Sequence, residues 1–467
     1  MAAPLSASLR RDLGTIESYA TLLGMLIGAG IFKVTSDAWA LTGPSVILGY
    51  LVLAPAILAT SVAYSVFLST PLGREPGGEY THLSRTFGGY GLAFVGVWLK
   101  VISYIGALAY LSRALGDYVV ELFAGALPKS AAMPVAIGSL LFFYVIHVAG
   151  VRWFGRIQVW MCVLLGLSII VLVGPGIFAI HAHNYQPFFT HGLGGFAAAL
   201  PLVFFGYAGF ESLAQTAGEV RDSTRRLPRI FLRGILATTV IYFLMSAVAF
   251  GVLPGAELRQ AAAPMAAVAS RYLPMGAAWF VTLGAVMALT TSVNATMLVP
   301  SRVGIMLAED GLAPGFIGSI AKRTGTPIVG LTLTLIVTLL LLVSGQVSLA
   351  LNIAVFALVC LYFLHSLALL ALPRANPSLY ASVTLGLPLW IQQLSAAISL
   401  LFMGTLIVVQ LRGDVDVLTR LSFRDRIEHA SLTTIELVVF WGVIGVVLYA
   451  IAAKGRRSSA DDADGHR

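Results

Sequence analysis

The chain has 467 residues, of which 58% are hydrophobic and only 11% are charged, against about 25% charged residues in ordinary soluble domains. The surface of a soluble protein must be largely polar, so this composition and a mean hydropathy of +0.89 exclude an ordinary soluble domain and indicate lipid around much of the chain. The formal net charge of +8 is read as a signal of membrane orientation rather than of nucleic-acid binding, because cations of membrane proteins gather on loops.

Apolar runs of roughly the length needed to cross a bilayer as helices follow one another along the chain. They lie at 15–42, 45–69, 91–124, 132–149, 156–180, 193–217, 230–253, 276–306, 326–344, 347–372, 384–410 and 431–453. If the N-terminus is cytoplasmic, the loops on its side hold most of the lysines and arginines, so the positive-inside rule places both termini in the cytoplasm. The sequence therefore predicts an all-α polytopic protein of the cytoplasmic (inner) membrane with 12 transmembrane helices.

Two of these runs are interrupted near their middle by pairs of glycines. The first run contains Gly28 and Gly30, and the sixth contains Gly206 and Gly209. Free backbone groups at membrane depth are tolerated only where they line a cavity or bind a ligand. The recurrence in two equivalent positions therefore indicates two broken helices around a central site. The alternative is that the glycines serve only close helix packing.

The sequence resembles the amino acid–polyamine–organocation (APC) transporters over almost its whole length. The likeness rests on these motifs, in this order: Ile27-Gly28-Ala29-Gly30-Ile31-Phe32, Pro76-Gly77-Gly78-Glu79-Tyr80, Gly209-Phe210-Glu211, Gly218-Glu219-Val220, Leu227-Pro228-Arg229, Ser301-Arg302 and Asp310-Gly311-Leu312-Ala313-Pro314. The resemblance implies a LeuT-like five-plus-five inverted repeat with broken helices 1 and 6. The expected division is a cytoplasmic N-terminus at 1–14, repeats at 15–180 and 193–372, two added helices at 384–453 and a cytoplasmic tail at 454–467.

The resemblance also implies where a substrate amino acid binds. The substrate carboxylate is expected at the backbone amides of residues 28–30, where free N–H groups at a helix N-terminus attract an anion. The substrate amine is expected at the carbonyls of Leu26, Ile27 and Phe205, which the breaks would leave without partners. The substrate-binding residues predicted in this way are Leu26, Ile27, Gly28, Ala29, Gly30, Lys33, Tyr104, Phe205, Tyr207 and Gly209.

Gating and proton coupling are assigned to residues near the two breaks. Phe205 matches the aromatic gate above the substrate in arginine/agmatine exchangers. Glu211 follows the second break, and a carboxylate in a span is costly unless it is paired or faces water, so it is predicted to carry a proton or to take part in the gate. Lys33 is assigned to the same group. The alternative for Glu211 is a structural carboxylate that is hydrogen-bonded to neighbouring helices.

The coupling ion stays open at this stage. Several proton-coupled relatives hold a lysine in the fifth span, but the matching residue here is Leu165. Lys33 is hypothesised to contact an anionic group of the substrate or to act as the titratable amine; alternatively, its ammonium reaches outward to the membrane surface. Thr291 and Ser292 offer a sodium site together with carbonyls of the first span, although hydroxyls in membrane helices commonly bond to helix backbones.

Other polar residues within the spans are interpreted as structural. Lys100 and Arg113 in the third span are expected to extend toward the two membrane faces. His147 and His365 are lone histidines on apolar helices and are expected to be core residues with satisfied hydrogen bonds. The resemblance alone places Glu219 and Arg302 in an intracellular gate.

The leading functional prediction is a secondary active transporter that moves amino acids by alternating access, either proton-coupled or as an exchanger. The sequence has no P-loop and no convergent acid, base or metal groups, so neither an enzyme nor a metal or other cofactor is expected. Cys162 and Cys360 lie singly in apolar runs and predict no disulfide or metal site. The expected partners are a small amino acid, membrane lipid, and a proton or sodium ion, with no nucleic acid. The alternatives are a transporter of polyamines or other organic amines, and a sensor that binds an amino acid without moving it.

Overall fold

The computed structural model describes residues 9–32, 34–123, 126–261, 263–422, 424, 426 and 433–464. Within these residues the regular structure is helical, and the one β-bridge joins Leu13 to Val220. The predicted all-α class is thus confirmed for the part of the chain that the structure describes.

Ten helical segments in the described residues are long and apolar enough to cross a membrane, and two shorter apolar helices accompany them. The ten segments are α1 (Thr15–Leu26) with α2 (Ala29–Phe32), α3 (Val34–Thr42) with α4 (Val46–Leu68), α6 (Gly91–Leu122), α7 (Ala132–Val148), α8 (Val151–Gly176), α11 (Ser223–Val252), α14 (Met275–Glu309), α16 (Val347–Ala375), α18 (Leu389–Arg420) and α20 (Thr434–Asp464). The two shorter helices are α9 (Gly192–Phe205) and α15 (Ile328–Val343). Each of the twelve predicted runs contains at least one of these helices, in the predicted order. The bounds differ in two ways: α3 joins α4 instead of ending the first span, and α9 and α15 are shorter than the other ten segments. The chain is a multi-pass membrane protein.

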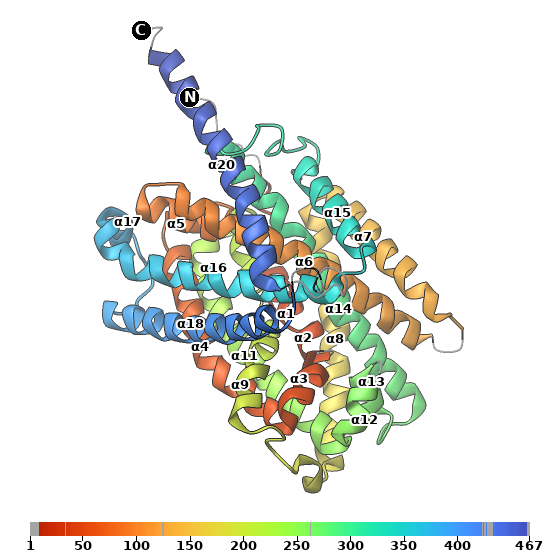
Figure 1. Cartoon of the computed structure of the whole chain (residues 1–467). Helices are drawn as coiled ribbons and strands as arrows, with labels where there is room; N and C mark the ends of the chain where they lie inside the picture. Colours follow the sequence, from red (N-terminus) through yellow and green to blue (C-terminus); the bar gives the residue numbers. More distant parts are fainter. Residues whose placement is uncertain are drawn as a thin grey trace.

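Short helices lie at the two ends of the bundle. Figure 1 shows α5 (Glu79–Phe87) and α17 (Pro377–Ala381) at one end, and α12 (Gly255–Gln260) and α13 (Pro264–Ala269) at the other. The one remaining short α-helix of the described chain, α10 (Ser212–Gln215), follows the second helix break. All five helices are too short to span a bilayer, so they add no spans. The four at the ends of the bundle cover the ends of the long helices.

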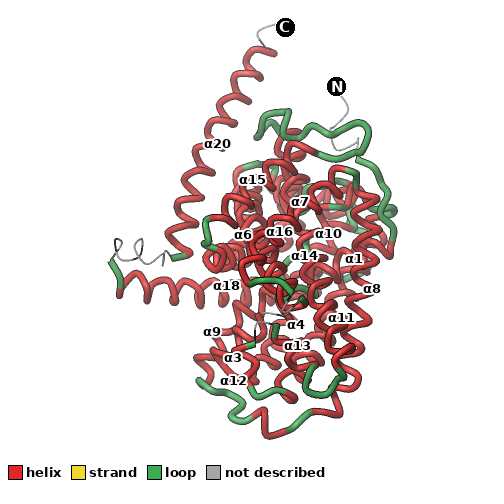
Figure 2. Tube along the Cα trace, turned by 90° about the vertical axis from the view of Figure 1, so that its right-hand side faces the viewer, coloured by secondary structure: helices red, strands yellow, loops and turns green. Residues whose placement is uncertain are grey.

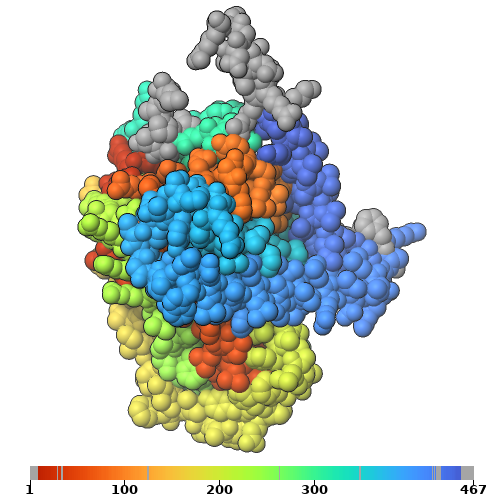
Figure 3. Space-filling model, turned by 90° about the vertical axis from the view of Figure 1, so that its left-hand side faces the viewer, coloured from red at the N-terminus to blue at the C-terminus, as the bar shows by residue number. Residues whose placement is uncertain are grey.

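The core of the bundle contains α6, α14 and α16. Helix α16 packs along α6 and α18, and α14 packs along α6 and α8. The last two long helices are peripheral: Figures 2 and 3 show α20 and the end of α18 standing away from the body. Apolar side chains on α20 are largely exposed, which suits contact with lipid. Helix α20 continues through Asp464, past the predicted end of the last span. The division into two inverted repeats stays a prediction.

Both predicted helix breaks are present. Helix α1 ends at Leu26 and α2 begins at Ala29, while α9 ends at Phe205 and the chain turns until α10 begins at Ser212. The breaks touch each other, because a Cβ atom on Gly30 would lie 2.2 Å from the Cα atom of Gly206. Only glycine allows this approach of two backbones.

A tyrosine from a neighbouring helix joins the two breaks. The Tyr242 hydroxyl on α11 donates to the carbonyl oxygen of Leu26 and lies 2.6 Å from the carbonyl oxygen of Gly206. Tyr242 is fully buried. Its side chain therefore satisfies polar backbone groups that both breaks expose at membrane depth.

Candidate functional site

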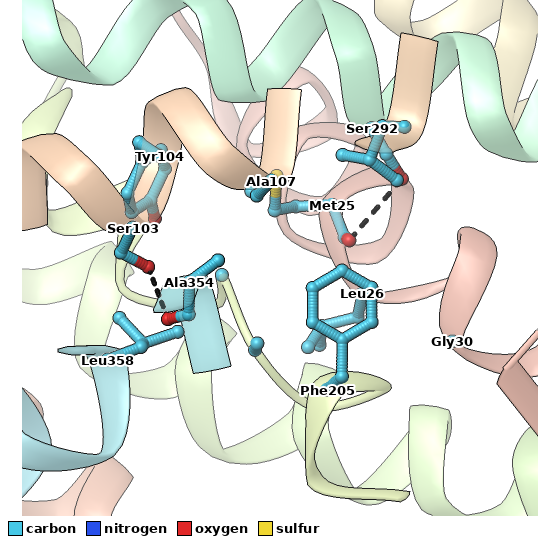
Figure 4. Close-up of a pocket in the computed structure, with 13 residues that line it drawn as sticks. Met25, Leu26, Gly30, Ser103, Tyr104, Ala107, Phe205, Ser292, Ala354 and Leu358 are labelled. Carbon is cyan, nitrogen blue, oxygen red and sulfur yellow. Dashed lines mark hydrogen bonds between the residues drawn. The ribbon is translucent and has the colours of Figure 1, made fainter. Parts of the chain in front are cut away.

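A small cavity of about 30 Å³ lies beside the two helix breaks (Figure 4). Its lining residues are Met25, Leu26, Gly30, Ser103, Tyr104, Ala107, Leu111, Phe205, Ala208, Gly209, Ser292, Ala354 and Leu358. A cavity needs roughly 10–15 Å³ of such space to hold one water molecule. The cavity therefore holds no more than a few waters, and an amino acid fits only after the surrounding helices move apart.

The wall of the cavity is built from small and apolar side chains on helix faces. Ser103, Ala107 and Leu111 recur at every fourth residue of α6, so they share one face of that helix. Ala354 and Leu358 have the same spacing on α16. The hydroxyl of Ser103 donates to the carbonyl oxygen of Ala354 at 2.7 Å and ties the two helices together. No lining side chain carries a charge, so the cavity suits an uncharged group.

Five of the predicted binding residues line this cavity. They are Leu26, Gly30, Tyr104, Phe205 and Gly209. The ring of Phe205 points into the space between the breaks, as Figure 4 shows. On its other side the ring makes an edge-to-face contact with Tyr110, at 5.8 Å between centroids. This position suits the predicted aromatic gate, which itself stays a prediction.

Several other predicted binding residues do not line the cavity. Ile27 and Gly28 lie in the first break but outside the cavity wall. Tyr207 is buried elsewhere, and its hydroxyl lies 3.0 Å from both the Tyr50 carbonyl oxygen and the Thr239 hydroxyl. The structure thus uses Tyr207 for packing between helices and not for the cavity wall.

The side chains of two predicted binding residues lie outside the part of the chain that the structure describes. Lys33 lies outside the residues that the structure describes, and the same holds for the side chain of Ala29. The hypothesis that Lys33 contacts the substrate or carries a proton therefore stays a prediction.

The backbone groups of the breaks are less free than the sequence suggested. The Gly28 amide donates to the Leu26 carbonyl oxygen at 2.9 Å, and the Ala208 amide donates to the Phe205 carbonyl oxygen at 3.1 Å. The Leu26 oxygen also accepts from Tyr242. The expectation that the Leu26 and Phe205 carbonyls lack partners is therefore wrong, because the turns and a buried tyrosine satisfy them.

Glu211 is fully buried between two tyrosines. The Tyr104 hydroxyl on α6 donates to Oε1 of Glu211 at 2.6 Å, and the Tyr362 hydroxyl on α16 donates to Oε2. The amide of Gly209 reaches the Tyr362 hydroxyl at 3.4 Å. These bonds fit the alternative that Glu211 is a structural carboxylate hydrogen-bonded to neighbouring helices. They also hold its carboxylate beside the cavity, and a role in proton coupling or in the gate stays a prediction. Sequence reasoning missed Tyr362 because only the fold brings α16 to this point.

The hydroxyls proposed for sodium lie against the first span. Thr291 and Ser292 on α14 donate to the Gly24 carbonyl oxygen at 2.9 and 3.0 Å, and both are also within hydrogen-bond distance of the Ala288 carbonyl oxygen. Ser292 also lines the cavity. These contacts agree with the alternative interpretation, in which the two hydroxyls bond to helix backbones. A sodium site here stays a prediction. On α8, Leu165 is buried and apolar.

Lys100 forms a buried ion pair, which the sequence did not indicate. Its ammonium lies 2.6 Å from Oε2 of Glu79, and both side chains are only 1% exposed. Oε2 also accepts from Gln215 at 2.8 Å, and Oε1 accepts from the Tyr64 hydroxyl. The expectation that Lys100 extends to a membrane face is therefore wrong, because Glu79 at the start of α5 supplies a buried partner.

Arg113, His147 and His365 were the other polar residues of the spans that were interpreted as structural. Arg113 pairs with Asp117 at 3.2 Å on the exposed side of α6. His147 is buried and lies 2.9 Å from the Asn294 carbonyl oxygen. His365 is buried and shares a hydrogen bond with another histidine on α5. Both histidines are thus buried core residues, as predicted. The expectation of satisfied hydrogen bonds is wrong for His365, because its Nδ1 atom has no hydrogen-bond partner among the described residues.

A second buried ion pair lies at the end of the bundle that contains α5. Arg302 contacts Glu219 through two nitrogens, at 3.1 and 3.4 Å, and both side chains are almost fully buried. Next to it, the Leu13 amide donates to the Glu219 carbonyl oxygen at 3.0 Å, and the Arg221 amide donates to the Leu13 carbonyl oxygen at 2.9 Å. The structure thus brings Glu219 and Arg302 into contact, and their role in an intracellular gate stays a prediction.

Comparisons with known proteins point to one group of membrane proteins. A family model described as amino acid permease matches residues 13–420. The branched-chain amino acid permease BcaP of Bacillus subtilis (strain 168) is 28% identical over 339 residues, which cover 69% of this chain and 72% of that protein. The methylthioribose transporter of the same strain is 26% identical over 422 residues, with coverages of 86% and 89%. The Asc-type amino acid transporter 1 of Mus musculus is 25% identical over 393 residues, with coverages of 81% and 74%.

Proposed function

Because the chain belongs to the amino acid permease family, within the APC superfamily, we propose that it is a secondary active transporter that moves amino acids across the cytoplasmic membrane by alternating access. It is a transporter rather than an enzyme. The observation that carries the proposal is the contact of two broken helices beside a small cavity at the centre of the bundle. Broken helices that meet around a central site are the arrangement through which such transporters bind a substrate.

The lining of the cavity supports a neutral amino acid as the substrate. Its side chains are apolar or carry a single hydroxyl, and none of them is charged. A charged substrate side chain would lose its hydration there without gaining a partner, which is costly. The same argument disfavours polyamines. The small residues Ser103 and Ala107 leave room on the α6 side for an apolar group. The Leu26 and Phe205 carbonyl oxygens already have partners, so they become available to the zwitterionic end only when the breaks rearrange.

The observed conformation fits a closed stage of the transport cycle. The cavity is too small for a substrate, and the pair of Glu219 and Arg302 closes one end of the bundle. Substrate entry then requires α1 with α2, and α9 with α10, to move relative to the remaining helices. Phe205 is proposed to cover the substrate, and Glu211 and Lys33 to take part in coupling. Both termini are proposed to lie in the cytoplasm, on the side of this ion pair.

The function is tested by uptake into proteoliposomes. Radiolabelled amino acids of neutral, acidic and basic type, together with putrescine, are offered with an inward proton gradient, with a sodium gradient, or with unlabelled substrate inside. Uptake of neutral amino acids supports the proposal. Binding without flux points to a sensor, and uptake of putrescine alone points to an amine transporter; either result contradicts it.

A further inference from the structure

A large apolar groove lies at the edge of the bundle, away from the central cavity. Its volume is about 960 Å³. It runs between α6, α14, α15 and α20, and part of the chain between α14 and α15 also lines it. We call this space the α20 groove. Its described lining consists of glycine, proline, aliphatic and aromatic residues and one threonine, and none of these residues is charged.

The lining of the α20 groove leaves no side-chain hydrogen-bond donor free. The polar side chains among the described lining residues are Trp98, Thr334 and Trp441. The Trp98 indole donates to the Trp441 carbonyl oxygen at 2.7 Å, and the Trp441 indole donates to the Trp98 carbonyl oxygen at 2.8 Å. The Thr334 hydroxyl donates to the Gly330 carbonyl oxygen at 2.8 Å. A polar ligand would lose its hydration there without gaining partners, so the groove suits a hydrocarbon chain.

The same two tryptophans hold α20 beside the groove. The Trp98 and Trp441 rings stack, with 4.2 Å between their centroids. A Cβ atom on Gly445 would lie 2.5 Å from the Trp98 ring, so glycine at this position lets the indole lie against α20. Most of α20 stands away from the body of the bundle (Figure 2). The tryptophan pair therefore fixes α20 to α6, and the groove lies between α20 and the helices α14 and α15.

The length of the α20 groove matches one leaflet of a bilayer. The groove follows α6 from Phe94 to Ile105. At about 1.5 Å per residue this stretch is about 16 Å long, and half of a hydrocarbon core of about 30 Å is about 15 Å. Ile105 is the neighbour of Tyr104, which lines the central cavity, so the groove runs from the α5 end of the bundle to its middle. A membrane-spanning helix of another protein would need about twice this length, whereas one acyl chain of a phospholipid occupies one leaflet.

Exposed cations lie on the turn that precedes α15. This turn, residues 321–326, is called the basic turn here; it follows the groove residue Ile317, and Gly330 in the first turn of α15 lines the groove again. Lys322 and Arg323 on the basic turn are exposed. No ion pair of the described chain joins either cation to an acidic residue. Two such cations next to the end of the groove attract an anionic group.

Two further arginines near this end of the groove differ in their partners. Arg85 on α5 pairs with Asp310 at 3.3 Å, and Asp310 directly precedes the groove residue Gly311. Arg10 is exposed and lies against the basic turn, since a Cβ atom on Gly325 would lie 3.2 Å from its Cγ atom. The acid next to the groove is thus paired, while the basic turn and Arg10 together present three cations. This arrangement is complementary to the phosphate of an anionic lipid.

We propose that the α20 groove binds one anionic phospholipid of the cytoplasmic leaflet, with an acyl chain along α6 and the phosphate beside Lys322 and Arg323. The choice of leaflet follows from the proposed orientation of the chain, and the cytoplasmic leaflet is the one in which anionic lipids meet basic segments. The inference goes beyond the proposed transport function and does not depend on it. The acyl chain fills the space between α20 and α15, so the lipid joins the peripheral helix α20 to the body of the bundle.

Native mass spectrometry of the full chain measures this binding. The purified protein is delipidated in mild detergent and titrated with phosphatidylglycerol, or with phosphatidylcholine that carries the same acyl chains. The parent is expected to bind one phosphatidylglycerol with a dissociation constant about tenfold or more below that for phosphatidylcholine, because each nearby cation favours an anionic lipid by about fivefold. The thermal unfolding midpoint with and without phosphatidylglycerol is the second readout, because a ligand that binds the folded state raises it.

Two double variants separate the acyl chain from the headgroup. Leu333→Trp combined with Val337→Trp fills the groove from α15, because both residues line it. This groove-filled variant is expected to lose the bound phosphatidylglycerol and the rise in unfolding midpoint. Lys322→Gln combined with Arg323→Gln removes the cations of the basic turn. It is expected to weaken binding of phosphatidylglycerol by about tenfold or more, to the level of phosphatidylcholine.

The matched control is Ile336→Trp combined with Leu340→Trp, because these residues are exposed on the same helix and do not line the groove. It is expected to bind phosphatidylglycerol as the parent does. Equal retention of this lipid by the groove-filled variant and the parent overturns the proposal, as do equal binding of the two lipids to the parent and loss of the lipid in the control. A mass of two chains that disappears only when the groove is filled also overturns it, because the occupant is then a second copy of the chain. These outcomes need no transport assay, so they are independent of the proposed transport function.

Discussion

The contact between the two helix breaks gives the sharpest test of the site. Changing Gly30→Ala adds a Cβ atom that would lie 2.2 Å from the Cα atom of Gly206 and 2.9 Å from its nitrogen. Both are backbone atoms, so no side chain can rotate away. The breaks must separate for the new methyl group to fit, and the closed conformation is destabilised.

The size of this effect follows from overpacking in a tight core. Such insertions cost about 1–3 kcal/mol, which lowers the population of the closed conformation by about 5- to 150-fold. A transport cycle that passes through this conformation slows by a similar factor. The initial rate of uptake into proteoliposomes measures the change, with the thermal unfolding midpoint of the purified protein as a second readout.

Gly166→Ala is the matched control. Gly166 lies on α8, and an added Cβ atom meets no atom within 4 Å. Alanine favours a helix over glycine by roughly 0.5–1 kcal/mol, so this variant is expected to be as stable as the parent or slightly more stable. Equal uptake rates and equal unfolding midpoints for Gly30→Ala and Gly166→Ala would refute the reasoning.

Three further changes test individual side chains. Phe205→Ala removes the ring over the cavity, a loss of about 1.5–3 kcal/mol of apolar contact, so the substrate concentration at half-maximal uptake should rise about tenfold or more; an unchanged value would exclude contact with substrate. Tyr104→Phe leaves one oxygen of Glu211 without its donor, and thermal unfolding should show destabilisation by about 1–3 kcal/mol, whereas an unchanged midpoint would contradict the described hydrogen bond. Arg302→Met strands Glu219 in the interior at a cost of about 3–5 kcal/mol. Adding Glu219→Gln should restore most of that stability in the same measurement, and no restoration would argue against the ion pair as the cause.

The order of the helices and the positions of both breaks were predictable from the sequence. Long apolar runs report membrane spans directly, because their length is set by the bilayer. Glycine pairs at Gly28 and Gly30, and at Gly206 and Gly209, report places where the backbone leaves the helix. Both signals are local, so they need no knowledge of how the helices pack.

The partners of the buried polar residues were not predictable in the same way. Lys100 looked like a residue that reaches a membrane face, because its partner Glu79 comes from a separate short helix. Likewise, Tyr242 and Tyr362 approach the breaks only after α11 and α16 have packed against them. Which face of an apolar helix turns inward is set by tertiary contacts, and a uniformly apolar sequence carries little trace of it.

For the cavity itself, the repeat of small residues at Ser103 and Ala107 was a usable signal. These residues lie four apart on one face of α6, together with Leu111. Small side chains at that spacing indicate either a close helix contact or an open space. Only the positions of Phe205 and Ala354 on other helices decide that it is an open space.

The hydrogen bonds of the Tyr242 hydroxyl help to explain how a transporter avoids leaking ions across the membrane. It touches the Leu26 and Gly206 carbonyl oxygens at once, while Gly30 and Gly206 are in backbone contact. Pulling one break away from the other exposes polar groups to hydrocarbon, which costs several kcal/mol. Separation of the two breaks is therefore unfavourable, and the direct backbone contact of Gly30 with Gly206 couples their movement. A movement that opens one mouth of the pathway pushes both breaks toward the other mouth, so a continuous pore through which ions could flow is disfavoured.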